Sequence, residues 1–432
     1  MNSKESPPLS CARWTDPVLI ALVAAIVYGL CRDLPLNNAG LACVVIIAVT
    51  LVMGAVEIFY APWRKLPRPK LSFTDILKSA GVRFAGLMAG FALTLLFWRL
   101  WPDYNTRGFS MFPRVVYALL PYVPLVTGAC VLFTEWRLGP AEDDTWHLGM
   151  LALGRWKKAK RAAAVQALLG WFVRAVFLPL NFMALITFIG RFRGNEHKIL
   201  DAPWQEAEYY VFAMLSGLLA AAIVPGYLFS SRLIGTHIRK VDATVTGWLA
   251  TLSCYPPLLG IIFTQGLNFY PHMERVKWAA PWATELADFP LAAMAAGAMV
   301  LLLEAVHYWG EAAFGLRASN LSNRGIITNG PFRFCKHPIY LVKCVIWFLW
   351  MPFLAGDTVP ENIYLTLMWA GTCAIYGARA WVEEKLLSDD PQYVAYALWM
   401  DRHGMFAWGG CLCPFLRFEW RLARWSAKSM PA

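Results

Sequence analysis

Long uninterrupted runs of apolar residues constrain this chain more than any other feature. A helix needs about 20 predominantly apolar residues to cross a bilayer. Ten runs approach or meet that length, centred on residues 17–31, 39–60, 80–101, 113–135, 167–190, 209–230, 243–266, 290–308, 339–355 and 363–380. Only 16% of the residues are charged, against about 25% in soluble domains. The sequence therefore predicts an all-α integral membrane protein with about ten transmembrane helices.

The basic residues between these runs predict the orientation. Of the 33 Lys and Arg residues that we assign to loops and termini, 26 fall on the side that holds both termini. Positive charge concentrates on the cytoplasmic side of membrane proteins, so both termini are predicted to be cytoplasmic. The net charge of +11 is thereby explained by topology and by contact with membrane lipids, and nucleic acid is not an expected partner.

Targeting and cysteine signals refine the expected location. The first run ends at Tyr28–Cys31 without a small-residue cleavage site, so no cleavable signal peptide is predicted. Together with the compact loops, this favours the bacterial inner (cytoplasmic) membrane. The ten cysteines are scattered, which is typical of reduced, packed thiols. Cys411 and Cys413 are too few to bind zinc alone, and no metal site is predicted.

The two parts of the chain differ in character. Residues 1–280 contain seven of the runs joined by short loops, and no role is assigned to them. Residues 281–432 contain the run at 290–308, a polar loop, two runs separated by a short turn at 356–360, and a tail predicted to be cytoplasmic. We place the chemistry in this second part.

The polar loop ends directly at a predicted helix start, in the stretch RGIITNGPFRFCKHPIYLVKCVIWF, residues 324–348. Pro338 suits the first turn of a helix, whose free N–H groups and dipole attract anions. Lys336 and His337 lie beside that turn, and Gly330 gives the loop conformational freedom. The stretch predicts a pocket for a small anionic group. The alternative is a basic anchor at the membrane face.

The second helix of the predicted hairpin ends in RAWVEEKLL, residues 379–387. Arg379 and Glu383 are four residues apart and share one helix face. Charges this close to a membrane span favour a functional role, although a plain ion pair is the alternative. The tight turn makes the two helices antiparallel, so this end is predicted to meet the 324–338 loop at the same face.

These pieces together resemble a known family. GPFRFCKHPIYL (330–341), then RAWVEEKLL (379–387) and YVAY (393–396) are similar to the C-terminal signature of the isoprenylcysteine carboxyl methyltransferase and phospholipid methyltransferase superfamily. The resemblance covers about residues 320–400. It implies a membrane methyltransferase that binds S-adenosylmethionine on the cytoplasmic side and takes its acceptor from the lipid. Lys336 stands where the family has Arg, Phe332 where it has Tyr, and Val342 where it has Gly.

The resemblance and the chemistry of the cofactor together assign residues. The cofactor carboxylate suits a cationic group, its ribose a carboxylate acceptor such as Glu384, and its sulfonium an aromatic face such as Tyr340, Phe334 or Trp381. The predicted cofactor-binding residues are Gly330, Lys336, His337, Pro338, Tyr340 and Glu384. The predicted catalytic residues are Arg379, Glu383, Glu304 and His307.

The assignment of Glu304 and His307 depends on helical spacing. With Glu311 they stand at i, i+3 and i+7 on one face of the predicted span that includes 290–308. An acceptor-side role, orienting the acceptor or removing its proton, is our hypothesis. A satisfied polar patch and half of a di-metal site are the alternatives, and the sequence holds no second copy of the motif.

Two other functions fit parts of the sequence. A sterol-type reductase using NADPH also carries an Arg-His-Pro-x-Tyr loop, but the Glu-Glu pair after the hairpin favours the methyltransferase. A transporter or scaffold without catalysis is the second alternative. The acceptor is a lipid or hydrophobic small molecule, and lipid amines, prenylated cysteine carboxylates, other lipid-like carboxylates and small thiols all fit.

Overall fold

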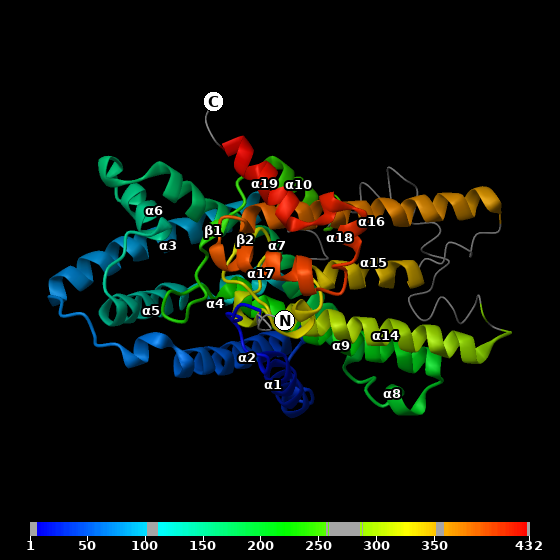
Figure 1. The fold of residues 1–432 in the computed structure, drawn as a ribbon. Coiled ribbons are helices and arrows are strands. Elements are labelled where there is room, and N and C mark those ends of the chain that lie inside the picture. Colours follow the sequence, from blue (N-terminus) through cyan, green and yellow to red (C-terminus); the bar gives the residue numbers. More distant parts are fainter. Residues whose placement is uncertain are drawn as a thin grey trace.

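Long helices dominate the computed structural model of this chain, which describes residues 7–101, 111–255, 258, 286, 288–350 and 358–429 (Figure 1). The α-helices are α1 (Asp16–Cys31), α2 (Asn38–Tyr60), α3 (Phe73–Leu100), α4 (Met111–Leu119), α5 (Val123–Leu138), α6 (Asp144–Ala152), α7 (Arg161–Phe192), α8 (Lys198–Asp201), α9 (Trp204–Leu228), α10 (Val245–Leu252), α14 (Pro290–Ala312), α15 (Pro338–Trp350), α16 (Val359–Leu387), α17 (Pro391–His403), α18 (Gly409–Leu412) and α19 (Phe418–Ser429). The shorter elements are η1 (Pro62–Lys65), η4 (Trp156–Lys158), η6 (Gly315–Arg317), η7 (Gly330–Arg333), η8 (Pro414–Leu416), β1 (Lys240–Val241) and β2 (Ser322–Asn323).

The length and composition of these helices confirm the class of an all-α membrane protein. Among the described residues, five helices are long and apolar enough to cross a membrane, namely α2 with η1, α3, α7, α9 and α14. The pair α4 and α5, bent by 60°, makes a sixth if it counts as one span. Helix α1 and the described part of α15 are apolar but shorter. Ten spans therefore remain a prediction, and the second part of the expected 243–266 span and most of the turn between α15 and α16 lie outside the described residues.

Side chains at the helix starts explain several of the boundaries. The Asn37 side chain accepts a hydrogen bond from the Gly40 N–H at 2.8 Å, and Ser72 and Asp143 accept equivalent bonds at the starts of α3 and α6. Pro338 is the first residue of α15, as its lack of an N–H predicts. Such caps satisfy N–H groups that have no partner inside the helix.

Helix α9 lies at the centre of the packing. It packs against α7 on one side and α14 on the other, and contributes Ala220–Val224 and Tyr227 to the largest apolar core with α1, α2 and α7. A Cβ at Gly226 would lie 2.4 Å from the Ala318 carbonyl oxygen, so only glycine allows the chain after α14 to approach α9 this closely. The antiparallel pair of β1 and β2 then ties residues 240–241 to residues 322–323.

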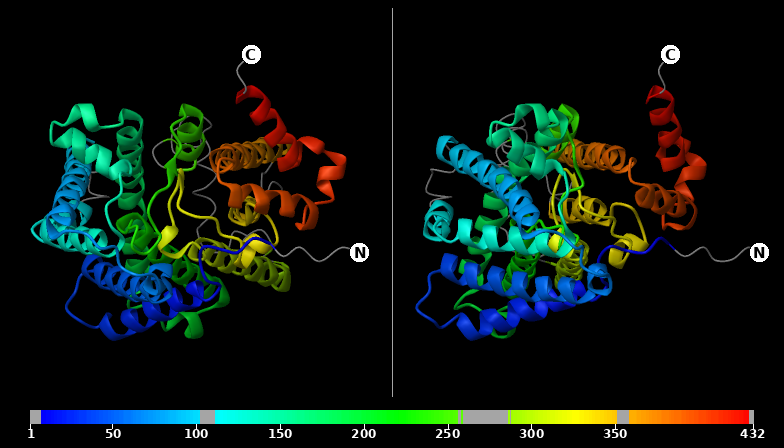
Figure 2. Two further views of the ribbon diagram at one scale, coloured as in Figure 1. Left: turned by 60° about the vertical axis from the view of Figure 1, so that its left-hand side comes forward. Right: turned by 90° about the vertical axis from the view of Figure 1, so that its left-hand side faces the viewer.

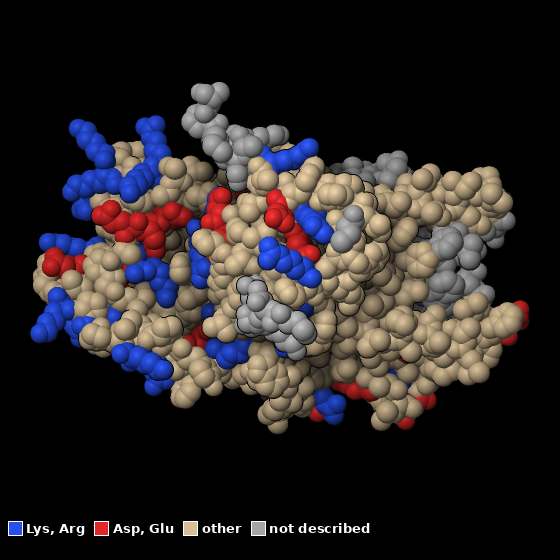
Figure 3. Space-filling view, viewed as in Figure 1, with Lys and Arg blue, Asp and Glu red and all other residues tan. Residues whose placement is uncertain are grey.

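The surface separates charged and apolar regions (Figure 3). Lys and Arg side chains gather over α3, α5 and α6, whereas the face over α14 and α16 shows few charges. The described N-terminal segment and α19 lie on the same side of the molecule in both views of Figure 2. The charge-poor face is the one expected of helices in contact with lipid.

Candidate functional site

A polar cavity lies where the 319–325 loop meets the cytoplasmic end predicted for the hairpin. Four of the predicted site residues line it, His337 and Tyr340 from the start of α15 and Arg379 and Glu383 from the end of α16. Helices α15 and α16 pack side by side (Figure 1). The structure thus brings together residues that the sequence separates by about forty positions.

Arg379 is one of three arginines that line this cavity, with Arg317 and Arg324. Its side chain is buried, and Nη2 donates a hydrogen bond to Asn320 Oδ1. Its Cζ lies 5.0 Å from the ring centroid of Tyr340 and 5.6 Å from that of Tyr255. Nη1 is buried and has no hydrogen-bond partner among the described residues. A buried donor of this kind is costly unless a further acceptor binds it.

Tyr340 connects the two helices of the hairpin. Its hydroxyl donates a hydrogen bond to Glu383 Oε2. Its ring stacks on His337 with centroids 5.4 Å apart and on Tyr376 at 5.8 Å. The cavity wall therefore combines aromatic faces with the carboxylate of Glu383.

Glu384 does not line the cavity and instead forms an ion pair with Arg421 of the tail. Its Oε1 lies 3.2 Å from His337 Nε2 and 3.4 Å from Lys336 Nζ, and its Oε2 lies 2.5 Å from Arg421 Nη2 in α19. The residue is 1% exposed and does not line the cavity. Lys336 also pairs with Asp401 in α17 at 3.0 Å. Lys336, Arg421 and the His337 ring around one buried carboxylate make this a structural junction between loop, hairpin and tail.

Gly330 and Pro338 shape the loop without lining the cavity. Gly330 has a φ of +57°, and a Cβ there would lie 3.1 Å from Trp309 Nε1. This left-handed conformation at a close contact favours glycine. Phe332 lines the cavity, and its ring meets Phe314 edge to face at 5.2 Å. Val342 is buried in α15.

Glu304 and His307 reach the cavity through Glu311. Glu304 is buried and accepts a hydrogen bond from Ser216 of α9 at 3.0 Å. His307 Nδ1 lies 3.1 Å from Glu304 Oε2, and Nε2 lies 3.8 Å from Glu311 Oε1. Glu311 lines the cavity and lies 3.8 Å from Lys343 Nζ. The expected polar face thus forms a row across α9, α14 and α15.

Sequence reasoning missed Asn320 and the cavity residues that the first part of the chain contributes. Asn320 is central, because its Nδ2 donates to the hydroxyls of Tyr227 at 2.8 Å and Tyr255 at 3.2 Å while its Oδ1 accepts from Arg379. Asn181 of α7 also lines the cavity. The cavity is therefore shared between residues 1–280 and 281–432. The polar run Ser319–Asn323 directly before the predicted loop was the available signal.

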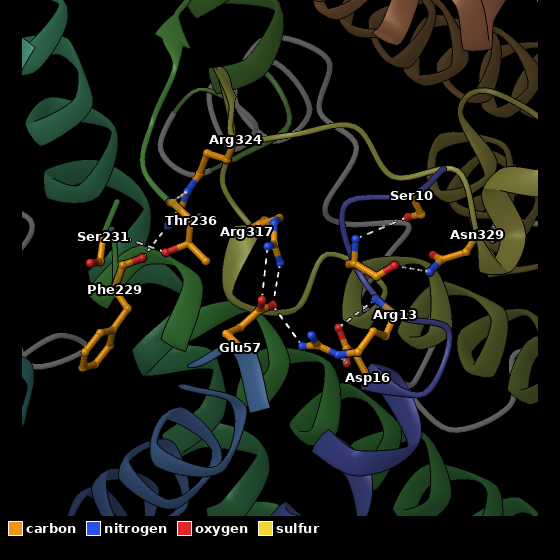
Figure 4. A network of polar contacts seen from close by, with 11 residues as sticks. Ser10, Arg13, Asp16, Glu57, Phe229, Ser231, Thr236, Arg317, Arg324 and Asn329 are labelled. Carbon is orange, nitrogen blue, oxygen red and sulfur yellow. Dashed lines mark hydrogen bonds and ion pairs between the residues drawn. The ribbon is translucent and has the colours of Figure 1, made fainter. Parts of the chain in front are cut away.

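A second polar network joins the cavity-lining Arg317 to α2 and to the segment before α1 (Figure 4). Arg317 Nη1 lies 2.6 Å from Glu57 Oε1, which also lies 3.0 Å from Arg13 Nη2, and Arg13 Nε pairs with Asp16 at 2.9 Å. The segment before α1 is thereby joined to α2 and to η6. Ser10 Oγ accepts from the Thr328 N–H at 3.2 Å, and the Pro8 carbonyl accepts from Thr328 Oγ1 at 2.7 Å.

Arg324 is the most deeply held cation of this network. It is 3% exposed and donates to the carbonyls of Thr236 at 2.8 Å and Gly226 at 2.5 Å, with further bonds to Ala318 and Phe229. Burial lowers the pKa of its guanidinium to about 9, so it is still a cation at neutral pH. It fastens the loop to the end of α9.

Comparison of the chain with protein-family models, with curated proteins and with solved structures finds no match in any of the three. The fold and the site define a helical membrane protein with a buried polar cavity at one end of α15 and α16.

Proposed function

We propose that this protein is an integral-membrane methyltransferase that uses S-adenosylmethionine and acts on a lipid or lipid-like acceptor. One observation carries the proposal: His337, Tyr340, Arg379 and Glu383, from two motifs that resemble the methyltransferase signature, line one cavity that contains an unpaired buried Arg379 Nη1. The helices around the cavity are long and apolar, which suits an acceptor that arrives from the lipid.

The residues present fit this cofactor. Arg379 Nη1 offers a charged hydrogen bond to an amino-acid carboxylate. Tyr340 and Tyr255 already accept the Arg379 cation on their ring faces, and such faces stabilise a sulfonium in the same way. Glu383 is the carboxylate on the cavity wall that can accept hydrogen bonds from ribose hydroxyls. We therefore assign that role to Glu383 in place of Glu384, both of whose oxygens face cations of the junction.

When bound, S-adenosylmethionine supplies an electrophilic methyl group. The chain contributes alignment and exclusion of water, which are the main protein contributions to such a displacement. Asn320 holds Arg379 in place, and the stacked rings of His337 and Tyr340 fix the side wall. Glu304 and His307 keep their acceptor-side role through Glu311, which lines the cavity, accepts the proton and passes it to His307 beside Glu304.

The proposed setting is the bacterial inner membrane, with ten spans and both termini in the cytoplasm. Helices α9 and α14 run in the same direction, because Ser216 meets Glu304 while Glu208 meets Gly297 about two turns earlier in each helix. Parallel packing of the sixth and eighth predicted spans supports the alternation that this topology requires.

Calorimetric titration of the detergent-purified protein tests the function. The wild type is expected to bind S-adenosylmethionine and not NADPH. A charged hydrogen bond contributes roughly 1.5–3 kcal/mol, so Arg379→Ala should weaken binding about tenfold to a hundredfold at ~1.4 kcal/mol per decade. Arg83→Ala, which removes another buried arginine that does not line the cavity, controls for general loss of fold. Binding of NADPH alone would establish the reductase alternative, and binding of neither would favour a non-catalytic role.

A further inference from the structure

An exposed apolar patch covers the segment between α17 and α19. Its large side chains are between 48% and 74% exposed. We call it the tail patch, and it consists of Met405, Phe406, Trp408, Leu412, Phe415 and Leu416. Several large apolar groups exposed together over so short a segment mark an interaction surface.

The tail patch is fixed beside the start of a membrane helix. The Met405 N–H donates to the Phe334 carbonyl at 2.8 Å, and Phe334, itself 54% exposed, precedes α15 by four residues. Phe418, fully buried against Tyr393 and Tyr396, anchors the other end. The patch therefore lies at the depth where α15 begins.

Exposed arginines flank the tail patch along the chain. Arg402 precedes Met405 by three residues, and Arg424 lies in α19, where its guanidinium is 3.8 Å from the ring centroid of Trp420. Asp401, by contrast, is buried and neutralised by Lys336. Aromatic and aliphatic side chains bordered by arginines are typical of segments that lie in the headgroup layer.

We propose that the tail patch inserts into the headgroup layer of the leaflet where α15 begins and binds anionic lipids through Arg402 and Arg424. Charge favours this occupant over a second copy of the chain. A two-fold contact would bring the arginines of both copies into one interface, whereas an anionic surface attracts each nearby cation by about 1 kcal/mol. The proposal is independent of the reaction proposed above.

Photo-crosslinking in proteoliposomes tests the insertion. The full chain carries p-benzoylphenylalanine at Leu412 or, as a matched control, at Asp389, an exposed acidic position in the turn before α17. The vesicles contain phosphatidylcholine and phosphatidylglycerol. We expect lipid adducts at position 412 and at least about tenfold fewer at position 389, because only the first position would be shielded from water. Equal lipid labelling at both positions, or adducts to a second protein chain at position 412, would overturn the proposal.

The charge requirement has its own test. Removing both cations with Arg402→Gln and Arg424→Gln should lower the ratio of phosphatidylglycerol to phosphatidylcholine adducts at position 412 by about fivefold per arginine, the equivalent of ~1 kcal/mol each. Size-exclusion profiles that match the wild type show that the variants fold. An unchanged ratio in the folded double variant would refute the binding of anionic lipid.

Discussion

At the scale of single residues, Glu383 and Glu384 are adjacent in α16 but contact different partners, Tyr340 in the cavity wall and Arg421 in the tail. Arg379, Glu383, His337 and Tyr340 could be predicted to converge because a hairpin places its two ends together. The different roles of Glu383 and Glu384 could not, because Arg421 approaches Glu384 from a tail that has no periodic relation to the hairpin.

Glu384→Ala should destabilise the protein rather than only weaken a ligand. The change would leave Lys336, His337 and Arg421 without their shared buried carboxylate, and breaking a buried ion pair costs roughly 3–5 kcal/mol. Thermal unfolding in detergent measures this, with Glu383→Ala as the neighbouring control. If Glu384→Ala unfolds at the wild-type temperature while losing S-adenosylmethionine binding, Glu384 belongs to the cofactor site as the sequence first suggested.

Cys335 in the loop should react slowly with alkylating reagents at neutral pH. Burial raises the pKa of its thiol to about 11, and only the thiolate reacts. Between pH 8 and pH 10 the thiolate fraction, and hence the rate of alkylation by iodoacetamide, should rise about tenfold per pH unit. Peptide mapping by mass spectrometry follows this cysteine individually. A rate that levels off below pH 9 would contradict the burial of the Cys335 thiol.

At the scale of elements, apolar runs predicted long membrane-spanning helices, of which the described residues show five or six, but did not predict which elements pack together. The starts of α2, α3 and α15 follow from Asn37, Ser72 and Pro338, whose capping chemistry is local. The pairing of β1 with β2 and the attachment of residues 8–13 to the loop involve contacts across long stretches of sequence. Such contacts depend on the packed bundle, so a single sequence gives them no local signal.

The contact between α9 and the loop predicts a strong effect at one glycine. A Cβ at Gly226 would approach the Ala318 carbonyl oxygen to 2.4 Å, whereas at Gly217 of the same helix the nearest atom outside the helix would be Phe188 Cβ at 3.5 Å. Gly226→Ala should therefore lower the free energy of unfolding by roughly 1–3 kcal/mol, as overpacking does. Gly217→Ala should be neutral or slightly stabilising. Thermal or denaturant unfolding of both variants in one detergent makes the comparison, and equal effects would contradict the close approach.

At the scale of the whole molecule, composition and charge predicted a helical membrane protein, and the structure confirms that class. The number of crossings is less well determined by the same signals, because α1 is short and α16 carries charged residues at its end. Three of the seven predicted spans without an assigned role contribute a residue each to the cavity, namely Asn181, Tyr227 and Tyr255. The division at residue 280 is therefore no boundary for the site.

Cysteine accessibility tests the predicted orientation. Asn37 and Asn362 precede or begin runs that would start on the outer side, so single cysteines there should react with a membrane-impermeant maleimide added outside intact cells. A cysteine at Lys157, in the basic segment assigned to the cytoplasm, should react only after the membrane is permeabilised. Labelling of both outer positions only after permeabilisation would overturn the topology. Asn37 caps α2, so its variant should lose about 1 kcal/mol of stability.

The bond between Pro8 and Thr328 joins positions that are 320 residues apart. A ribosome adds roughly 5–20 residues per second, so the partner of the first described segment emerges only about 15–65 s after that segment itself. Throughout this time Pro8 and Ser10 lack their hydrogen-bond partner Thr328. Closure of the cavity wall is consequently a late event of biogenesis, and a nascent chain that stalls in α14 would display its N-terminal segment to chaperones and proteases.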